Sequence, residues 1–200
     1  MFPEITRDDI FRLETERLWL RWPRAADAPT FARLAGNPDV ALKTARIPQP
    51  YEPRQAEEFI MLSRAENDRG DGLSLVLTLK RHPGEAIGVI GAHGAAQRGV
   101  ASIGFWLGKP YWKQGLMTEA ATAFLDLIFG VTSLDRVESH VMFDNPASKR
   151  VHEKLGFVSQ GCCVFPAPAR GGDVPAERFQ LTRGQTHTTF GARRPKLTES

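Results

Sequence analysis

Residues 112–118 (Trp-Lys-Gln-Gly-Leu-Met-Thr) have the composition of a turn that can bind a phosphate group. They follow the strand-like run 101–107 and lead into an apolar-periodic run from Leu116, which predicts a strand–loop–helix unit. The start of a helix carries unpaired N–H groups and partial positive charge, and Gly115 lets the backbone approach a bulky anion. An ordinary turn also needs a glycine, so that interpretation stays open. The segment matches neither G-x-x-x-x-G-K-S/T nor G-x-G-x-x-G.

A second group of polar residues recurs with helical spacing after residue 144. Asn145, Ser148 and His152 stand at i, i+3 and i+7, along one stripe of a predicted helix. The adjacent apolar stripe comprises Ala147, Val151 and Leu155. The polar stripe is either a solvated face or a ligand-facing row with one titratable histidine. Histidine suits proton transfer because its unperturbed pKa, ~6.5, lies close to neutrality.

The elements around these two groups predict a single mixed α/β domain. Alternating apolar residues predict strands at 16–22, 73–80, 85–93, 101–107, 137–142, 157–165 and 176–183. Helical periodicity and end signals predict helices between Asp27 and Gly36, over 53–68, from 116 onward, and over 146–155, with Asp27 and Asn145 as caps. Residues 166–175 are predicted as a loop. The order predicts antiparallel hairpins and at least one strand–helix–strand crossover.

The charge is small and unevenly distributed. The chain of 200 residues has 26 Lys and Arg against 23 Asp and Glu, a net charge of +3. Residues 184–200 hold Arg193, Arg194 and Lys196 against Glu199, so about two of those charges lie in the last seventeen residues. The remainder is nearly neutral and shows no basic–aromatic interleaving, which argues against a nucleic-acid partner.

Cysteine use and apolar runs predict a cytoplasmic protein without a membrane partner. Cys162 and Cys163 are adjacent, a spacing that disfavours a mutual disulfide and matches no metal motif. Residues 1–24 lack the apolar core of a signal peptide. The longest apolar runs, 73–79 and 124–129, are far shorter than the ~20 residues of a membrane span.

Three segments together resemble the GNAT superfamily of acyl-CoA-dependent N-acetyltransferases, in particular its ribosomal-protein alanine N-acetyltransferases. They are 13–21 (LETERLWLR), 103–107 with 111–120 (IGFWL and YWKQGLMTEA), and 136–157 (RVESHVMFDNPASKRVHEKLGF). The resemblance implies a GNAT-like single domain over residues 1–183, with a twisted, mostly antiparallel mixed sheet of about seven strands flanked by about four helices. Residues 184–200 would form a basic, flexible tail.

The resemblance also implies where acetyl-CoA binds. Backbone groups of Phe105, Trp106 and Leu107 would pair with the pantetheine arm like an added strand. Backbone N–H groups of the next loop would hold the pyrophosphate, with the binding residues Lys113, Gln114, Gly115, Leu116, Met117 and Thr118. Asn145 and Ser148 would contact the cofactor from the following helix. No metal is implied.

The implied reaction is direct attack of a primary amine, from a protein N-terminus or a small molecule, on the thioester. His152 stands where related enzymes often carry a tyrosine acid, so it is the candidate general acid for the leaving thiolate, with Ser148 as a minor candidate. Ser102 replaces a glutamate that is frequent in this branch, which leaves the base unassigned among His93, Glu138 and His140. Trp112 and Met117 also depart from the superfamily loop, and Glu119 is expected to order the first helical turn.

Two alternatives come from other classes. A GNAT-fold protein that binds acyl-CoA without turnover, as a sensor, is suggested by the incomplete set of bases. A small nucleic-acid-binding protein is suggested only by the isoelectric point near 9.1. For the enzyme, either a monomer or a homodimer is expected.

Overall fold

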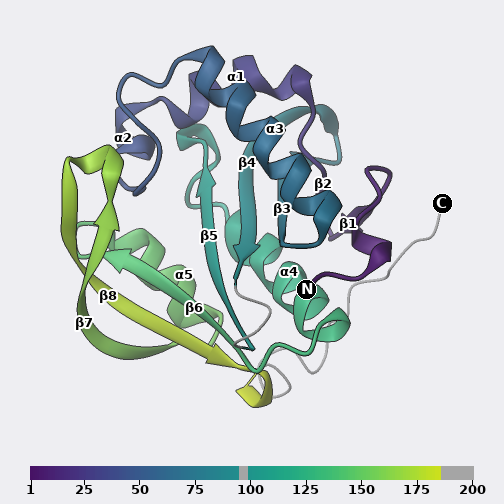
Figure 1. The fold of residues 1–200 in the computed structure, drawn as a ribbon. Coiled ribbons are helices and arrows are strands. Elements are labelled where there is room, and N and C mark those ends of the chain that lie inside the picture. Colours follow the sequence, from purple (N-terminus) through teal and green to yellow (C-terminus); the bar gives the residue numbers. More distant parts are fainter. Residues whose placement is uncertain (95–98, 186–200) are drawn as a thin grey trace.

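The centre of the molecule is a single twisted sheet (Figure 1), seen in a computed structural model that describes residues 1–94 and 99–185. Its eight strands run in the order β1-β2-β3-β4-β5-β6-β8-β7. They are β1 (Arg12–Glu14), β2 (Leu18–Arg21), β3 (Gly72–Leu79), β4 (His82–His93), β5 (Val100–Leu107), β6 (Arg136–Met142), β7 (Val158–Ala167) and β8 (Gly172–Thr182). Neighbouring strands are antiparallel except β5 and β6, which are parallel. The predicted mixed, mostly antiparallel sheet is therefore confirmed.

Helices cover both faces of the sheet. α1 (Ala28–Ala35) and α3 (Pro53–Arg69) lie on one face, with the short α2 (Pro38–Ala41) between them in the chain, and α4 (Leu116–Val131) and α5 (Pro146–Lys154) lie on the other (Figure 1). The larger core cluster packs α4 against the sheet, through residues such as Phe124 and Ile128. The smaller one joins α1 and α3 to the opposite face, around Phe31 and Val89.

Strand β3 shows why helices are needed on both faces. Leu73, Leu75, Leu77 and Leu79 alternate as predicted, yet all eight residues of the strand are buried. The intervening Ser74 and Thr78 use hydrogen bonds to tolerate this: the Ser74 N–H donates to Asn67 Oδ1 at 2.7 Å, and Thr78 Oγ1 donates to the Trp19 carbonyl at 3.3 Å. A central strand with helices above and below is buried on both sides.

The predicted cap of α1 is wrong in its chemistry. Asp27 is the residue before α1, but its carboxylate makes no cap bond to that helix. It instead accepts two hydrogen bonds from the guanidinium of Arg21, at 2.7 and 2.8 Å, and one from the Arg24 N–H at 2.8 Å. Both side chains of this pair are buried, so Asp27 joins β2 to the segment before α1.

Three short features differ from the sequence prediction. Strand β1 and helix α2 have too few residues to show periodicity, and both are missing from it. The segment 166–175, predicted as a loop, is mostly the end of a hairpin: β7 and β8 remain paired to Ala167 and Gly172 around the turn η5 (Pro168–Arg170). Tail residues 186–200 lie outside the described residues, so the predicted tail stays a prediction.

Strands β5 and β6 diverge soon after they meet. Among the described residues, only three pairs join the two strands, from Val100 opposite Arg136 to Ser102 opposite Glu138. Strand β5 continues to residue 107 and β6 to residue 142. The Ser139 hydroxyl donates to the Ile103 carbonyl at 3.2 Å at the point of divergence. Beyond it, the edge of β5 that faces β6 has backbone groups without a strand partner in the part of the chain that the structure describes.

Candidate active site

The loop between β5 and α4 has an unusual backbone. Gly115, the residue before α4, has a φ of 75°, and Lys113 has a φ of 61°, although it is not a glycine. The left-handed region costs a residue with a Cβ roughly 1–2 kcal/mol, so the loop shape is held by its surroundings. Lys113, Gln114 and Gly115 are exposed, which leaves their backbone open to a ligand.

The first turn of α4 supplies free N–H groups beside this loop. The first backbone bond of the helix runs from the Glu119 N–H to the Gly115 carbonyl, at 3.0 Å. The N–H groups of Leu116, Met117 and Thr118 precede it and have no carbonyl within the helix to bind. Together with the positive end of the helix dipole, they form an arrangement suited to a phosphate.

A residue far away in the sequence holds this loop in place. The guanidinium of Arg17 donates through Nη1 to the Gln114 carbonyl at 2.9 Å and through Nε to Glu119 Oε2 at 2.6 Å. The Arg17 N–H and the Thr15 hydroxyl both donate to Glu119 Oε1, at 2.8 and 2.6 Å. Burial opposes ionisation of Glu119, but these hydrogen bonds outweigh it and lower its pKa.

Arg17 is the residue of this site that the sequence reasoning missed. Its Nη2 atom lies 3.6 Å from where a Cβ on Gly115 would be, and its side chain is 45% exposed. Arg17 therefore places a positive charge beside the loop and also holds the loop in position. Glu119 does order the first turn of α4, and it does so by anchoring the turn between β1 and β2.

Trp112 connects the loop back to the end of β5. Its indole Nε1 donates to the Leu107 carbonyl at 2.6 Å. The loop is thus held at both ends. Trp112 ties its start to the end of β5, and Arg17 binds Gln114 and Glu119 at its other end. That carbonyl, one of the groups predicted to pair with the pantetheine arm, is already engaged. Phe105 and Trp106 are partly buried on opposite faces of β5, in the two core clusters.

Helix α5 begins as predicted. Asn145 is its N-cap, with Oδ1 accepting from the Ser148 N–H at 3.1 Å. The Asn145 amide also donates to the Lys43 carbonyl at 3.4 Å, so both ends of the side chain hold protein groups. Ser148 is partly buried, and its carbonyl accepts from His152 Nδ1 at 2.8 Å.

The stripes of α5 differ from the prediction at Ala147 and His152, while Val151 and Leu155 pack toward the core as predicted. His152 is 1% exposed and Leu155 is buried, whereas Ala147 is exposed. The imidazole lies among three aromatic rings, with centroids 5.3 Å from Phe105, 5.0 Å from Phe157 and 5.4 Å from Phe179. Hence it is a core residue at the point where α5 meets β5 and β8.

The burial of His152 sets its protonation. Desolvation lowers its pKa to about 4, against a smaller opposing effect of the Ser148 carbonyl. Since Nδ1 donates to that carbonyl, the neutral ring has its lone pair on Nε2, which is buried without a partner among the described residues. At neutral pH His152 therefore carries no extra proton unless a bound ligand raises its pKa.

The three candidate bases lie on one face of the sheet. His93 pairs with Ser102, and Ser102 with Glu138, and paired residues share a face. His140 follows Glu138 by two residues and so shares that face too. It is the α3 face, where His93 Nδ1 lies 2.9 Å from Glu66 Oε2. Periodicity alone left this facing open.

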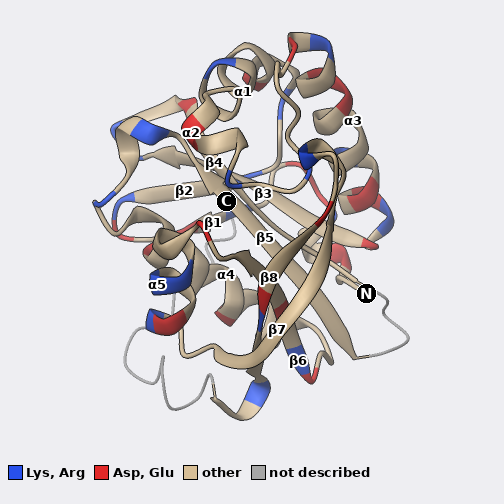
Figure 2. Ribbon diagram, turned by 90° about the vertical axis from the view of Figure 1, so that its left-hand side faces the viewer, with Lys and Arg blue, Asp and Glu red and all other residues tan. Residues whose placement is uncertain are grey.

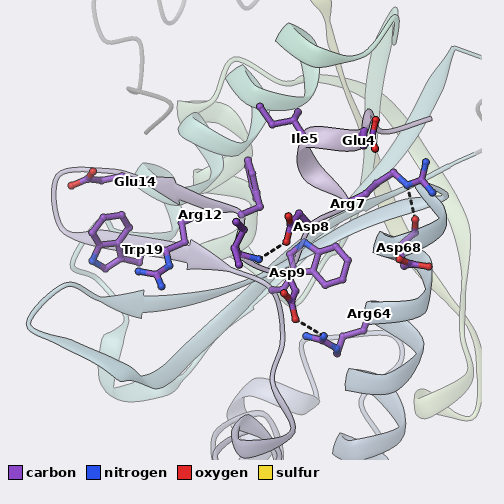
Figure 3. A pocket seen from close by; sticks show the side chains of 13 residues that line it. Glu4, Ile5, Arg7, Asp8, Asp9, Arg12, Glu14, Trp19, Arg64 and Asp68 are labelled. Atoms are coloured by element: carbon purple, nitrogen blue, oxygen red, sulfur yellow. Dashed lines mark hydrogen bonds and ion pairs between the residues drawn. The ribbon is translucent and has the colours of Figure 1, made fainter. Parts of the chain in front are cut away.

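A hollow of about 1010 Å³ lies elsewhere on the same side of the sheet. Figure 3 shows it between the N-terminal turn, the β1–β2 hairpin and the end of α3. Its polar groups bind one another: Arg64 Nη2 lies 2.9 Å from Asp9 Oδ2, and Arg7 Nε donates to the Asp68 carbonyl at 2.5 Å. Five acidic and three basic side chains line it, a balance that does not suit a ligand carrying phosphate groups.

Charges are mixed over the surface as well. Basic and acidic segments are interspersed on the face seen in Figure 2, unlike the basic stripe of a typical nucleic-acid interface. Within residues 1–94 and 99–185, no helix is both long and apolar enough to cross a membrane. In the same ranges, no group of three or more His, Cys, Asp or Glu is placed to hold a metal ion.

Comparison with known proteins agrees with this geometry. The family described as "Acetyltransferase (GNAT) domain" matches residues 17–158. The protein named uncharacterized N-acetyltransferase p20, from Bacillus licheniformis, is 28% identical over 172 residues, which are 86% of this chain and 96% of that protein. The structure of RimL, a ribosomal L7/L12 alpha-N-protein acetyltransferase in complex with coenzyme A, has a TM-score of 0.74 at 18% identity and covers 86% of this chain and 97% of RimL.

A second solved structure has the same fold. The ribosomal-protein-S5-alanine acetyltransferase from Vibrio fischeri has a TM-score of 0.71 at 19% identity, over 86% of this chain and 96% of its own. The chain belongs to the GNAT acetyltransferase family. It is an N-acetyltransferase that uses acetyl-CoA, as the resemblance predicted.

Proposed function

We propose that the chain transfers the acetyl group of acetyl-CoA to a primary amine, either a protein N-terminus or a small molecule, by direct attack on the thioester. In this proposal the loop residues Lys113 to Gly115 and the first-turn residues Leu116 to Thr118 bind the pyrophosphate through their N–H groups. Phe105, Trp106 and the N–H side of Leu107 line the pantetheine path. Asn145 and Ser148 approach the cofactor from α5. The enzyme works in the cytoplasm.

The observation that carries the proposal is the turn at Gly115. A left-handed residue, three N–H groups without helical partners and the Arg17 guanidinium converge there. The divergence of β5 from β6 supports the pantetheine path, because it leaves a strand edge beside this turn. A thioester bound along that edge would lie close to the Phe105 ring and the neighbouring His152.

The general-acid role of His152 stays a prediction, with Ser148 as the minor candidate. With its pKa lowered to about 4, the free enzyme holds no proton on Nε2 at neutral pH. The role therefore requires that the developing thiolate raise the pKa of the ring as it leaves. A thiolate beside Nε2 has this effect, since an opposite charge favours the protonated imidazole.

Thiol release in the presence of acetyl-CoA and an amine panel tests the proposed function. The panel holds a short peptide with a free N-terminal alanine, one with serine, a free amino acid, a polyamine and an aminoglycoside. Saturable release of coenzyme A with at least one amine, and an acetylated product of that amine by mass spectrometry, are expected.

The sensor alternative makes the opposite prediction. It expects saturable binding of acetyl-CoA, measured by calorimetry, with no thiol release for any member of the panel. Such a result would retain the acetyl-CoA site and remove the transfer reaction.

A further inference from the structure

Among residues 1–94 and 99–185, no helix lies over one part of the sheet. On the α3 side, α1 and α3 cover β3, β4 and the Trp106 end of β5, whereas the first part of β5 and β6 remain open between α3 and the β7–β8 hairpin (Figure 1). Ser102 and Gly104 of β5 are exposed there, and a Cβ on Gly104 would meet no atom within 4 Å. This open face lies opposite α4, on the other side of the sheet from the acetyl-CoA turn.

Titratable side chains gather on the open face at the divergence of β5 and β6. Glu138 lies beside Ser102 in the last paired register, and its side chain is 24% exposed, with Arg136 Nε 3.1 Å from Oε1. His140 comes two residues later on β6, at the level of Gly104 on β5. An acyl group carried along the edge of β5 would reach this level from the α4 side.

The ring of His140 is held by stacking, and one of its nitrogen atoms has no hydrogen-bond partner among the described residues. It stacks on Phe165 of β7, with centroids 4.3 Å apart and planes 11° from parallel. Its Nδ1 is buried and has no partner among the described residues. Since burial disfavours a charged ring whose Nδ1 lacks a partner in these residues, the free enzyme holds His140 in its neutral form.

Neighbouring charges act on this ring from two strands. Burial lowers the pKa of His140, Glu138 on its own strand raises it, and Arg178, its register partner on β8, lowers it. The outcome is a pKa below the usual value. His140 is therefore neutral, and able to accept a proton, at neutral pH.

We propose that His140 accepts the proton of the acceptor amine on the open face, and that Glu138 attracts the ammonium form of that amine to it. This inference rests on the proposed function. Because Glu138 is partly exposed beside the neutral His140 ring, with Arg136 and Arg178 as the neighbouring cations, and because Gly104 leaves room over β5, the face suits a primary amine on a slender chain.

The proton balance of the step is simple. The ammonium first releases one proton to solvent. The neutral amine nitrogen then forms a bond to the acetyl carbon, the C–S bond breaks, and coenzyme A leaves as a thiolate. The nitrogen becomes acidic as this bond forms, and one of its protons passes to the imidazole. The ring then releases that proton to water or to the thiolate, so the products are an amide and a thiol.

The test uses the best acceptor of the amine panel at saturation. We expect His140→Ala to lower kcat roughly 100-fold, the size of effect usual for a general base, and to remove the acidic limb of the kcat–pH profile. The affinity for acetyl-CoA should be unchanged, and added imidazole should restore part of the rate. His82→Ala is the matched control, since His82 is an exposed histidine at the start of β4.

Glu138 is tested separately through KM. Glu138→Gln should raise the KM for the amine and leave the affinity for acetyl-CoA unchanged, whereas Glu153→Gln on α5 should alter neither.

If amines are acetylated and His140→Ala keeps the rate and pH profile of the wild type, the inference fails and the proposed function survives. If acetyl-CoA binds and no amine is acetylated, both fail. A folded variant is verified by its unchanged acetyl-CoA affinity, and loss of rate without rescue by imidazole also counts against His140.

Discussion

At the scale of single residues, the site depends on conformations and protonation states that only the fold can impose. Gly115 was predicted to allow a close approach of the backbone, and the structure gives a more specific reason for the glycine: its positive φ. The space around it is open, since a Cβ at this position would have Arg17 Nη2 as its one near neighbour, at 3.6 Å. Strain, rather than crowding, is what a side chain would introduce.

Gly115→Ala should therefore destabilise the bound loop by about 1–2 kcal/mol and weaken acetyl-CoA binding. Titration calorimetry measures the affinity, and chemical denaturation measures the free energy of unfolding. Gly130→Ala is the control, because Gly130 lies near the far end of the same helix with open space around it. Equal acetyl-CoA affinities for Gly115→Ala and the wild type would exclude the turn as the pyrophosphate site.

His152 should make the protein less stable in acid. Its pKa is about 4 when folded, against about 6.5 in the unfolded chain, so the unfolded state binds the proton first as the pH falls. The stability from the neutral ring is complete above pH 6.5 and is lost between pH 6.5 and 4, by an amount of order 3 kcal/mol.

His152→Phe separates this effect from catalysis, because phenylalanine suits the surrounding aromatic rings. Denaturation at pH 7, 5.5 and 4.5 should show a shallower pH dependence for the variant than for the wild type. If His152 is the general acid, kcat of the variant falls while the affinity for acetyl-CoA stays the same. An unaltered kcat would leave His152 as a packing residue.

At the scale of elements, the sequence predicts helices and strands with a local repeat, and it misses short elements and contacts between residues far apart in the chain. The four alternating leucines of β3, the apolar face of α4 and the Asn-Pro start of α5 are local patterns, and all were found in place. The strand β1 has three residues and α2 has four, too few for a period to show. The β7–β8 hairpin was shortened in the prediction because Pro and Gly residues near its end are typical of loops.

The same division applies to the candidate site. The turn at 112–118 was predicted because glycine and an apolar period adjoin in the sequence. Its tie to Arg17 was not, because the two segments are about 100 residues apart. The unexpected burial of His152 has a related cause: a histidine counts as polar in a pattern, yet here Ser148 and three aromatic rings make its burial possible.

Arg17→Ala should weaken acetyl-CoA binding about tenfold, equivalent to 1.4 kcal/mol. The change frees the Gln114 carbonyl and leaves the Glu119 carboxylate, 17% exposed, without its guanidinium. Calorimetry gives the affinity, and Arg69→Ala is the control, since Arg69 forms an exposed pair with Asp71. Glu119→Gln distinguishes two mechanisms: if it weakens binding as well, Arg17 acts by holding the loop, and if it does not, Arg17 contacts the ligand directly.

At the scale of the whole molecule, the described residues form one sheet with two helical layers, and both parts of the proposed site belong to it. The turn proposed to bind acetyl-CoA lies on the α4 side and the open face on the α3 side, so in this proposal the two substrates meet from opposite faces where β5 and β6 diverge. The net charge of the chain, +3, has no evident part in this arrangement, since about two of those charges lie in the last seventeen residues.

Removal of residues 186–200 should leave acetyl-CoA affinity and the kcat of the best amine unchanged. The proposed binding groups all lie between residues 17 and 152, and the described chain ends at Gln185, whose side chain accepts from the Thr182 N–H at 2.7 Å. Calorimetry and thiol release on the truncated protein measure the two quantities. A lower affinity would place the tail at the acetyl-CoA site.

The bonds from Thr15 and Arg17 to Glu119 also bear on how the protein opens. These bonds join the β1–β2 hairpin to the turn at Gly115. Local unfolding of the hairpin would therefore release the turn, and a ligand bound at the turn would oppose that unfolding. Amide hydrogens of β2, such as that of Leu20, would then exchange with solvent more slowly in the presence of acetyl-CoA. A strand that the cofactor never touches would report its occupancy.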